Sequence, residues 1–509
     1  MEKQNLKKQF PINLISNFVY FVLSVLIGIW FTPYLIKHLG VAVYGLVPLA
    51  MSVIDYMGIM TTSFNSAVAR FLTIGLHKED EIEANKTFNT ALWSSLLFII
   101  SVMPVLILCA YFSPKIFNIP SGQEYNSQIF FTTMVVVFSI YAISSNFLVS
   151  SFAVNRFDLR NIIKCSDIVV RVLIIVFLFS FSASKLWFVS SGYLGGALAT
   201  LVGAIFVWRI LTPNLKISFR NFDKSKLSNL THMSGWVLFD QIGTVLFLST
   251  ELILVNRLCG SEAAGQYAVI LPWVILLRAM SDIVSSTLTP MYFAYYAKGE
   301  IANIVNLLKK SIKFLGLFLA LPVGLICGFA SSLLTVWVGP SFAGLAPLMC
   351  ILIGHLVFSL AILPVFAIQV TFNKVRIPAI VTFVIGVCQV VLAVFFVRVF
   401  NWGFYGIALA AVLSYLLRNI GFSLIYVAKI LKIDIYACFV SLAPGIISML
   451  VVAAASFFLE QVLRPGTWLV LLCCGISIAL MYLYVIVKFI LNPEEKKLFL
   501  SVIPIKKIA

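Results

Sequence analysis

Charged residues are scarce in this chain of 509 residues. They account for 11% of the sequence, whereas 61% of the residues are apolar and the mean hydropathy is +1.05. Soluble domains carry roughly 25% charged residues, so a chain with so few charges cannot cover a water-exposed surface of this size. The composition excludes a soluble enzyme, a nucleic-acid-binding protein and a secreted disulfide scaffold, and it indicates that most of the chain faces lipid.

Motifs that bind metal ions are also lacking. The nine cysteines include no Cys-x-x-Cys pair and lie nearly all in apolar runs, where we expect them to pack between membrane helices. The four histidines are far apart in the sequence and share no metal-ligand spacing. The sequence therefore predicts no zinc or haem site and no bound cofactor.

Long apolar runs, by contrast, recur along the whole sequence. A helix needs ~20 apolar residues to cross a bilayer, and the runs that are separated by charges or turn signals give fourteen candidates. The expected spans lie near 12–36, 42–66, 88–112, 128–152, 162–182, 186–208, 233–256, 264–290, 314–338, 346–371, 378–399, 404–427, 436–459 and 466–491. The predicted fold class is an all-α polytopic membrane protein.

The basic residues predict the orientation of these spans. Of the 36 Lys and Arg residues, 27 fall in the terminal segments and in alternate loops, six in the opposite loops and three inside spans. Short basic loops stay on the cytoplasmic side of a membrane. We therefore expect both termini in the cytoplasm, and the net charge of +17 mainly reflects this topology.

An internal repeat is visible in the turns between spans. Gly40 and Gly45 after the first span match Gly260 and Gly265 after the seventh, at an offset of 220 residues, and each pair has a tyrosine nearby. Four further matches follow in the same order: Lys78-Glu79-Asp80 with Lys298-Gly299-Glu300, Pro104 with Pro322, Asn155-Arg156 with Asn373-Lys374, and Gly192 to Ala199 with Gly403 to Ala410. Six helices separate the copies, so both copies enter the membrane in the same direction.

This parallel repeat predicts the domain organisation. We expect an N-lobe of six helices over 1–210, a basic cytoplasmic linker over 211–232 and a C-lobe of six helices over 233–430. A C-terminal helix pair and tail then occupy 431–509. Two such lobes around a central cavity are typical of alternating-access transporters.

Three segments give the sequence a resemblance to a known superfamily. They are Tyr34 to Gly45, Glu251 to Tyr267, and Leu288 through Pro322 to Gly339. With them the chain resembles the multidrug/oligosaccharidyl-lipid/polysaccharide flippase superfamily, and within it the bacterial O-antigen and polysaccharide flippases. Lipid II flippases of this superfamily carry charges in the first helix, whereas this chain has none between Pro11 and Ile36, so the polysaccharide branch is the better match.

The resemblance implies a function, partners and a location. It implies a flippase that moves an undecaprenyl-pyrophosphate-linked oligosaccharide, such as an O-antigen repeat unit, to the outer leaflet of a bacterial inner membrane. Its partners would be this lipid-linked oligosaccharide, membrane lipids, and a polysaccharide polymerase with its chain-length machinery. The alternative within the same fold is a cation-coupled exporter of drugs or other small molecules.

Charges inside the spans are candidate site residues because each costs ~2.5–3.5 kcal/mol near the bilayer centre unless it faces protein or water. The resemblance places the central cavity along the first two helices of each lobe, which selects Asp55, Asp240, Arg278 and Asp282. A guanidinium forms forked hydrogen bonds to phosphate, so Arg278 is the candidate for binding the lipid phosphate. The alternative is that Arg278 and Asp282, one helical turn apart, neutralise each other.

Asp55 and Asp240 have no opposite charge within a helical turn of sequence. A buried carboxylate of this kind tends to be protonated, which suits a site that binds and releases H+ or Na+; a neutral, hydrogen-bonded acid without a transport role is the alternative. Glu251 and Arg418 are secondary candidates, the first expected near the external interface and solvated, the second expected to pack inside its span.

Asp167 and Arg171 are also one helical turn apart, and we expect them to form a structural pair. An enzyme is not predicted, because no external loop exceeds about 15 residues and none holds paired carboxylates or a Ser/His set.

Overall fold

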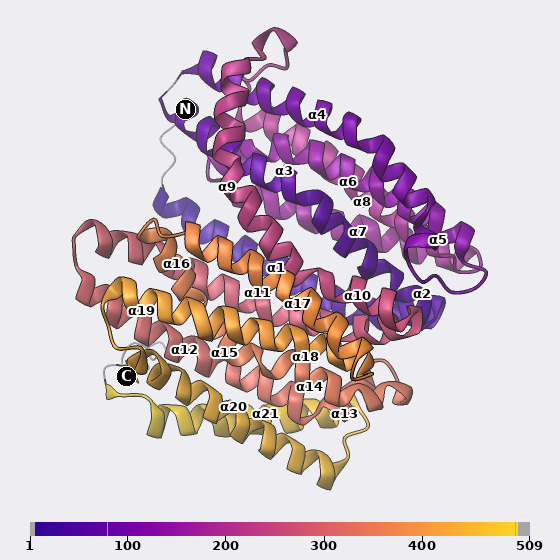
Figure 1. Ribbon diagram of the computed structural model, residues 1–509, viewed down its shortest axis with the longest axis vertical. Coiled ribbons are helices and arrows are strands. Elements are labelled where there is room, and N and C mark those ends of the chain that lie inside the picture. Colours follow the sequence, from indigo (N-terminus) through magenta and orange to yellow (C-terminus); the bar gives the residue numbers. More distant parts are fainter. Residues whose placement is uncertain (1–5, 79, 494, 497–509) are drawn as a thin grey trace. The chain divides into compact units, whose positions relative to one another are not determined.

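The structure is a computed structural model that describes residues 6–78, 80–493 and 495–496, and every regular element in these ranges is a helix (Figure 1). The helices before the chain midpoint are α1 (Leu6–Leu39), α2 (Val41–Tyr44), α3 (Leu46–His77), α4 (Glu81–Tyr111), α5 (Ser113–Ile116), α6 (Glu124–Ala153), α7 (Phe157–Phe181), α8 (Leu186–Leu211), the 3-10 helix η1 (Phe219–Asn221), α9 (Lys224–Leu248) and α10 (Thr250–Cys259). The later helices are α11 (Ser261–Ala297), α12 (Ile301–Gly328), α13 (Ala330–Trp337), the 3-10 helix η2 (Pro340–Leu345), α14 (Ala346–Gly354), α15 (Leu356–Ala361), α16 (Leu363–Thr371), α17 (Arg376–Arg398), α18 (Gly403–Leu416), the π-helix η3 (Leu417–Leu424), α19 (Ile425–Leu431), α20 (Ile435–Leu463), α21 (Trp468–Val485) and the π-helix η4 (Ile486–Ile490).

The helices form two compact units. The first contains Met1–Pro272 and Arg376–Ser414, and the second contains Trp273–Val375 and Tyr415–Ala509. Helices α11 and α18 therefore contribute to both units. The lobe boundaries drawn from the repeat stay a prediction.

The all-α membrane fold is confirmed, whereas the count of fourteen spans is not. The described residues contain 12 helices long and apolar enough to cross a membrane, or 13 when α9 and α10, which meet at an angle of 44°, are taken as one span. The expected span near 162–182 is the helix α7, which does not count among them. Its apolar stretch is interrupted by Lys164, Asp167 and Arg171, and this charge content separates α7 from the other spans.

The matched turns of the repeat have the same backbone conformation. Gly40 and Gly260 have φ values of 79° and 96°, which lie in the left-handed region. Asn155 and Asn373 likewise have φ values of 56° and 52°. These two pairs of matched turns are therefore equivalent in structure.

Inside the first unit, the two glycine turns touch one another. A Cβ atom on Gly45 would lie 2.7 Å from the Gly265 backbone nitrogen, and one on Gly265 would lie 2.1 Å from the carbonyl oxygen of Val41. Only glycine at both positions permits this approach of α2 and α3 to the start of α11. The repeat signature thus marks a backbone contact as well as two turns.

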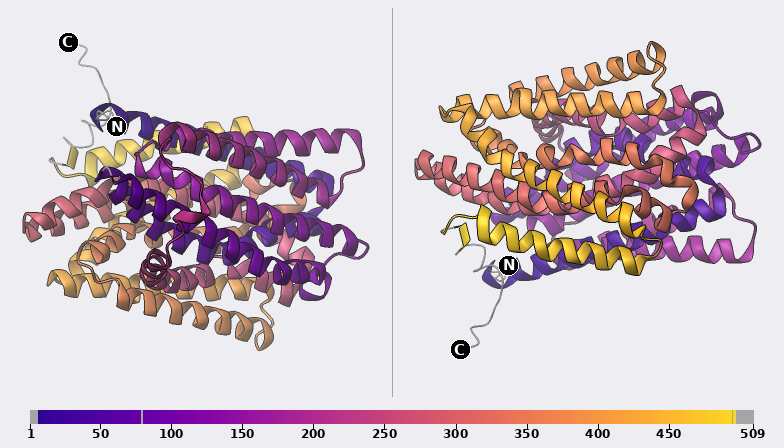
Figure 2. Two further views of the ribbon diagram at one scale, coloured as in Figure 1. Left: turned by 90° about the horizontal axis from the view of Figure 1, so that it is seen from above. Right: turned by 90° about the horizontal axis from the view of Figure 1, so that it is seen from below.

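In the second unit, α12 packs along α20 through small residues (Figures 1 and 2). Gly316, Gly324 and Gly328 lie at intervals of eight and four residues, which places them on one face of α12. A Cβ on Gly324 would lie 2.7 Å from Val452 Cβ, and one on Gly328 would lie 2.3 Å from Ser456 Cβ. Small residues at such intervals let membrane helices approach closely and gain packing contacts that lipid cannot supply.

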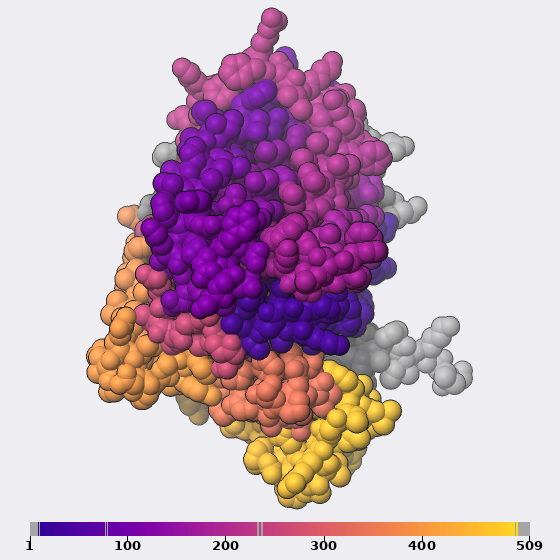
Figure 3. All heavy atoms as spheres, turned by 90° about the vertical axis from the view of Figure 1, so that its right-hand side faces the viewer, coloured from indigo at the N-terminus to yellow at the C-terminus, as the bar shows by residue number. Residues whose placement is uncertain are grey.

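The segment between α8 and α9 is fixed against α4 in the first unit. Asn85 and Asn89 of α4 accept hydrogen bonds from the backbone N–H groups of Lys216 and Ser218, at 2.8 Å and 2.7 Å. Figure 3 shows violet and magenta atoms, from this part of the sequence, side by side on one face of the first unit. Asp223 then caps α9, which begins at Lys224 and so occupies part of the expected linker.

Candidate functional site

A bend between α9 and α10 in the first unit collects polar side chains. The Thr250 hydroxyl donates to the Leu246 carbonyl oxygen at 2.7 Å, a back-bond that commonly bends helices. The hydroxyl of Tyr56 on α3 donates to the Thr250 oxygen. Since Thr250 has already given its proton to the backbone, the tyrosine must be the donor.

Two of the predicted carboxylates lie at this bend. Ser249 Oγ donates to Asp55 Oδ2 at 2.9 Å, so the neighbouring residues of α3, Asp55 and Tyr56, bind neighbouring residues of the bend. Glu251 lies next along the chain, and the hydroxyl of Tyr267 donates to its carboxylate. The bend is therefore held from two directions by side chains of α3 and α11.

The structure corrects the expected environment of Glu251. We predicted a solvated side chain near the external interface, but Glu251 is only 9% exposed. Its position in the first turn of α10 and its tyrosine partner explain how a carboxylate is tolerated there. Asp55, in contrast, is exposed at the bend, and Asp240 is half-buried on α9, nine residues before Ser249.

Arg278 is the centre of a second polar cluster, which lies in the second unit. Its guanidinium carbon is 5.0 Å from the ring centroid of Tyr415, and its Nη2 group donates to the tyrosine hydroxyl. The tyrosine ring in turn lies 5.0 Å from the ring of His355. A cation, a phenol and an imidazole thus stack in sequence on α11, α18 and the junction of α14 with α15.

His355 has an unusual hydrogen-bonding position. It is 7% exposed, and its Nδ1 atom is 3.2 Å from the carbonyl oxygen of Ile351. Its Nε2 atom is buried and has no hydrogen-bond partner in the part of the chain that the structure describes. A buried polar atom of this kind is uncommon and calls for a ligand, a water molecule or a change of conformation.

The other two candidates in the second unit have different environments. Asp282 is exposed one helical turn beyond Arg278 and within its electrostatic reach. Arg418 lies in the π-helix η3, where its guanidinium carbon is 4.7 Å from the ring centroid of Phe366. Short π-helical segments are frequent at functional sites, and η3 begins two residues after Tyr415.

The predicted pair of Asp167 and Arg171 is present in the first unit. Arg171 Nη2 lies 3.9 Å from Asp167 Oδ2, and Tyr141 donates to Asp167 Oδ1 at 2.8 Å. The Arg171 guanidinium also lies 4.5 Å from the ring centroid of Tyr193. These partners account for both charges structurally.

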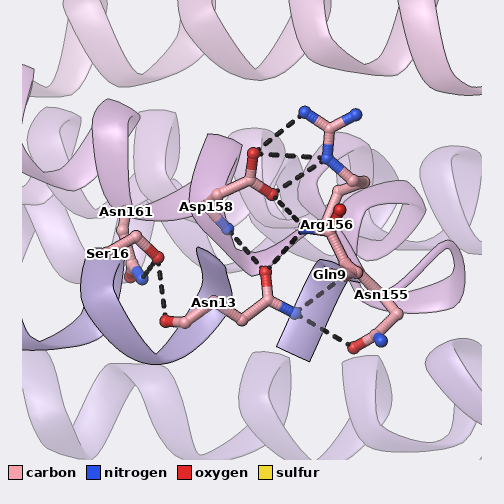
Figure 4. A network of polar contacts seen from close by, with 7 residues as sticks. All are labelled: Gln9, Asn13, Ser16, Asn155, Arg156, Asp158 and Asn161. Carbon is pink, nitrogen blue, oxygen red and sulfur yellow. Dashed lines mark hydrogen bonds and ion pairs between the residues drawn. The ribbon is translucent and has the colours of Figure 1, made fainter. Parts of the chain in front are cut away.

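A third polar cluster joins the beginning of α1 to the beginning of α7 (Figure 4). Asn13 donates to the Asn155 carbonyl oxygen at 3.0 Å and accepts from the Asp158 backbone N–H at 3.2 Å. The Asp158 carboxylate accepts from Arg156 Nη2 at 2.9 Å and from Gln9 Nε2 at 2.9 Å. We call the seven residues drawn in Figure 4 the α1–α7 network; Ser16 and Asn161 extend it along the two helices.

Sequence reasoning missed the neutral partners in these clusters. Tyr56, Tyr267, Tyr415 and His355 carry no fixed charge. Their partners lie well beyond one helical turn, from 16 residues away for Tyr267 and Glu251 to 194 for Tyr56 and Thr250. A search for charges inside spans finds Asp55, Glu251 and Arg278 but none of their uncharged partners. The signal that would have helped is a polar ring in an otherwise apolar run, as at His355.

Comparison with known proteins identifies the family. Residues 12–296 match the family described as "Polysaccharide biosynthesis protein". The chain is 32% identical over 497 residues to the "Uncharacterized membrane protein EpsK" of Bacillus subtilis (strain 168), which covers 97% of this chain and 98% of that protein. The chain belongs to the polysaccharide biosynthesis protein family. This confirms the resemblance seen in the sequence motifs.

Two more distantly related proteins agree with this family assignment. A "Putative O-antigen transporter" of Shigella flexneri is 23% identical over 376 residues, which are 72% of this chain and 86% of that protein. The solved structure of the lipid II flippase MurJ in an inward closed conformation has a TM-score of 0.66 at 13% identity, and covers 92% of this chain and 97% of its own. The family member described here is therefore a multi-pass membrane protein with a MurJ-like fold.

Proposed function

We propose that this protein moves a lipid-linked oligosaccharide from the cytoplasmic to the outer leaflet of a bacterial inner membrane by alternating access. The substrate would be an O-antigen-like repeat unit on undecaprenyl pyrophosphate. Family membership and the transporter name of the Shigella relative support the substrate class. Arg278 and its aromatic partner support the recognition of a phosphate group.

The geometry of Arg278 is the observation that carries this proposal. An arginine inside a membrane helix is costly unless it faces protein or water. Tyr415 orients the guanidinium through a cation–π contact and a hydrogen bond. A guanidinium in this orientation has the forked donor geometry that suits the paired oxygens of a pyrophosphate.

Substitution of Arg278 tests this role. Losing a hydrogen bond to a charged group costs about 1.5–3 kcal/mol, which corresponds to roughly 10- to 100-fold in substrate affinity. We expect Arg278→Ala to lower translocation of the lipid-linked repeat unit by at least the smaller factor, with Arg278→Lys intermediate because it keeps the charge without the fork. Normal translocation by Arg278→Ala at a normal protein level contradicts the proposal.

Asp282→Asn separates phosphate binding from simple neutralisation. If the two side chains only balance each other, removing the acid leaves an uncompensated arginine and lowers the amount of folded protein. If Arg278 binds the substrate, Asp282→Asn keeps the folded protein and retains translocation. Protein level in purified membranes and translocation in the same membranes give the two readouts.

A cation-coupled exporter is the second candidate function, and the acidic residues favour it. The residues predicted for the cavity include three carboxylates, Asp55, Asp240 and Asp282, and a single arginine, Arg278. In this function the cell exports small cations without any lipid-linked sugar. Efflux of cationic dyes from cells that lack the polysaccharide substrate distinguishes the two functions.

In either function, we propose that Asp55 couples transport to the movement of an ion. Its carboxylate accepts from Ser249 at the bend of α9 and α10, so a change in its ionic state would act directly on the bend. We expect Asp55→Asn to abolish the response of transport to an imposed H+ or Na+ gradient while leaving the protein folded. Testing each gradient separately in vesicles identifies the ion, and an unchanged response to both contradicts the proposal.

A further inference from the structure

Two cysteines of the second unit lie together at one end of α12. Cys327 is the second-last residue of α12, and Cys350 lies in the middle of α14. The Cys350 thiol donates a hydrogen bond to the Cys327 carbonyl oxygen, with a sulfur–oxygen distance of 3.4 Å. This contact distinguishes them from cysteines that simply fill space between membrane helices.

The same two cysteines line a cavity of about 550 Å³. Its walls come from α12, α13, α14, the end of α20 and the connection between α20 and α21, and they include the polar side chains of Ser331, Glu460 and Arg464. Cys327 and Cys350 are both partly exposed. A cavity of this size, with polar side chains in its wall, admits small water-soluble reagents to the thiols.

The surrounding contacts hold the cysteine-bearing segments in place. Glu460 Oε1 accepts a hydrogen bond from the backbone N–H of Ser332 at 2.6 Å, which fixes α20 to the first turn of α13. A Cβ atom on Gly354 would lie 3.9 Å from the Cys327 sulfur, so the second half of α14 also faces this thiol. These contacts hold the segments that carry the two thiols close together.

We propose that Cys327 and Cys350 form a reversible disulfide by exchange with a soluble disulfide oxidant. One thiol, as its thiolate, attacks a sulfur of the oxidant and releases the first reduced oxidant thiol. The second cysteine then attacks the mixed disulfide and releases the other. The two cysteine sulfurs are oxidised, the oxidant disulfide is reduced to two thiols, and the two cysteine protons end on those thiols.

The predicted topology places this cavity on the side where such oxidants occur. In the orientation expected from the basic residues, the connection between α20 and α21 is external. Disulfides form and persist outside the cytoplasm. The bond would tie α12 to α14 across α13 and η2, and would restrict any separation of these helices during transport.

Oxidation of intact cells tests the proposal. We treat cells that express the full chain with a charged disulfide reagent that does not cross membranes, alkylate the remaining thiols, and digest the purified protein. No Lys or Arg lies between 313 and 374, so trypsin leaves both cysteines on one peptide. Chymotrypsin cuts between them, for example at Phe329 or Trp337, and resolves a cross-linked pair by mass spectrometry.

The expected result is a Cys327–Cys350 linked peptide pair that appears with the reagent and disappears after reduction. Cys327→Ser and Cys350→Ser each abolish it, whereas Cys388→Ser, which changes an exposed cysteine on α17, leaves it unchanged. The proposal is overturned if both cysteines are still fully alkylated after treatment while the protein remains folded. A link that forms only with a membrane-permeant reagent overturns the external location of the cavity.

Discussion

Two turns of the repeat have the same backbone but different surroundings. The N–H of Arg156 donates to the Ser151 carbonyl oxygen at 2.8 Å, and the N–H of Lys374 donates to the Gln369 carbonyl oxygen at the same distance. Both pairs are related by an offset of 218 residues. Each turn also contains the asparagine with positive φ described above.

The side chains separate the two turns. The first belongs to the α1–α7 network, in which Asn13 is only 8% exposed. In the second, Asn373 and Lys374 are exposed. At the position of Asp158 the second copy has Arg376, so the charge is reversed. The repeat therefore fixes the path of the backbone, while the tie to α1 is a property of the first turn.

Substitution of Gly265 disrupts the backbone contact between the two glycine turns of the repeat, and we expect it to have the largest effect on folding. A Cβ on Gly265 would overlap the Val41 carbonyl oxygen, and neither backbone can move without displacing its helix. Overpacking of this kind costs about 1–3 kcal/mol and more where backbone is involved. Gly265→Val should abolish the monodisperse peak in detergent chromatography.

Gly475→Ala is the matched control for this substitution. No heavy atom lies within 4 Å of the position that its Cβ would take, and Gly475 lies inside α21. We expect a normal chromatographic peak. If Gly265→Val also gives a normal peak, the contact between the copies does not determine the fold.

Asn13→Leu removes the hydrogen bonds to α1 that distinguish the first turn from the second. It removes the amide that binds Asn155 and Asp158 and leaves buried backbone groups without partners, which costs about 1–3 kcal/mol. We expect a clear fall in the thermal unfolding temperature in detergent. The control is Lys374→Ala in the second turn, which should leave the temperature unchanged; equal effects of the two variants contradict a specific role for the α1–α7 network.

Alanine at the two positive-φ asparagines tests how alike the turns are. The left-handed backbone conformation is unfavourable for alanine by roughly 1–2 kcal/mol, and asparagine tolerates it better. Asn155→Ala and Asn373→Ala should therefore lower the unfolding temperature by similar amounts. Asn373→Gly should restore stability at the second turn, because glycine adopts this conformation freely; a loss as large as that of alanine would show that the side chain, not φ, matters.

The turns were predictable because their signals are local. A glycine or asparagine at positive φ depends on neighbouring residues only, so the matches at Gly40 with Gly260 and at Asn155 with Asn373 pointed to real structural equivalence. The span count was less secure. The number depends on whether α7, with its three charges, and the bent pair of α9 and α10 are each counted as a span. Mean hydropathy alone does not decide either case.

The site was predictable only in part, because its partners come from distant segments. The scarcity of charges singled out Arg278 and Asp55, but Tyr415 and Ser249 lie 137 and 194 residues from these partners. No periodicity links such pairs. Glu251 shows the opposite case, since its place near a span end suggested solvent, whereas a tyrosine from α11 covers it.

Acid pH should weaken the first turn slightly and leave the second unaffected, which is the smallest effect expected. Asp158 lies before the expected span of α7. Burial raises the pKa of its carboxyl, but the hydrogen bonds and positive charge of Arg156 and the hydrogen bonds from backbone N–H groups together outweigh burial and hold this pKa below its ordinary value. The charged carboxylate therefore stabilises the fold at pH values above about 3.9, the ordinary pKa of aspartate.

This stabilisation disappears as the pH falls through the lowered pKa of the folded protein. At pH 7 we expect Asp158→Asn to unfold at a lower temperature than the parent protein, and the gap to close toward pH 3 as the parent carboxylate becomes neutral. Thermal unfolding at several pH values in one detergent measures the gap. A gap that stays constant down to pH 3 would mean that Asp158 acts through its shape and not through its charge, and the charge reversal at Arg376 would then not explain why the two turns differ.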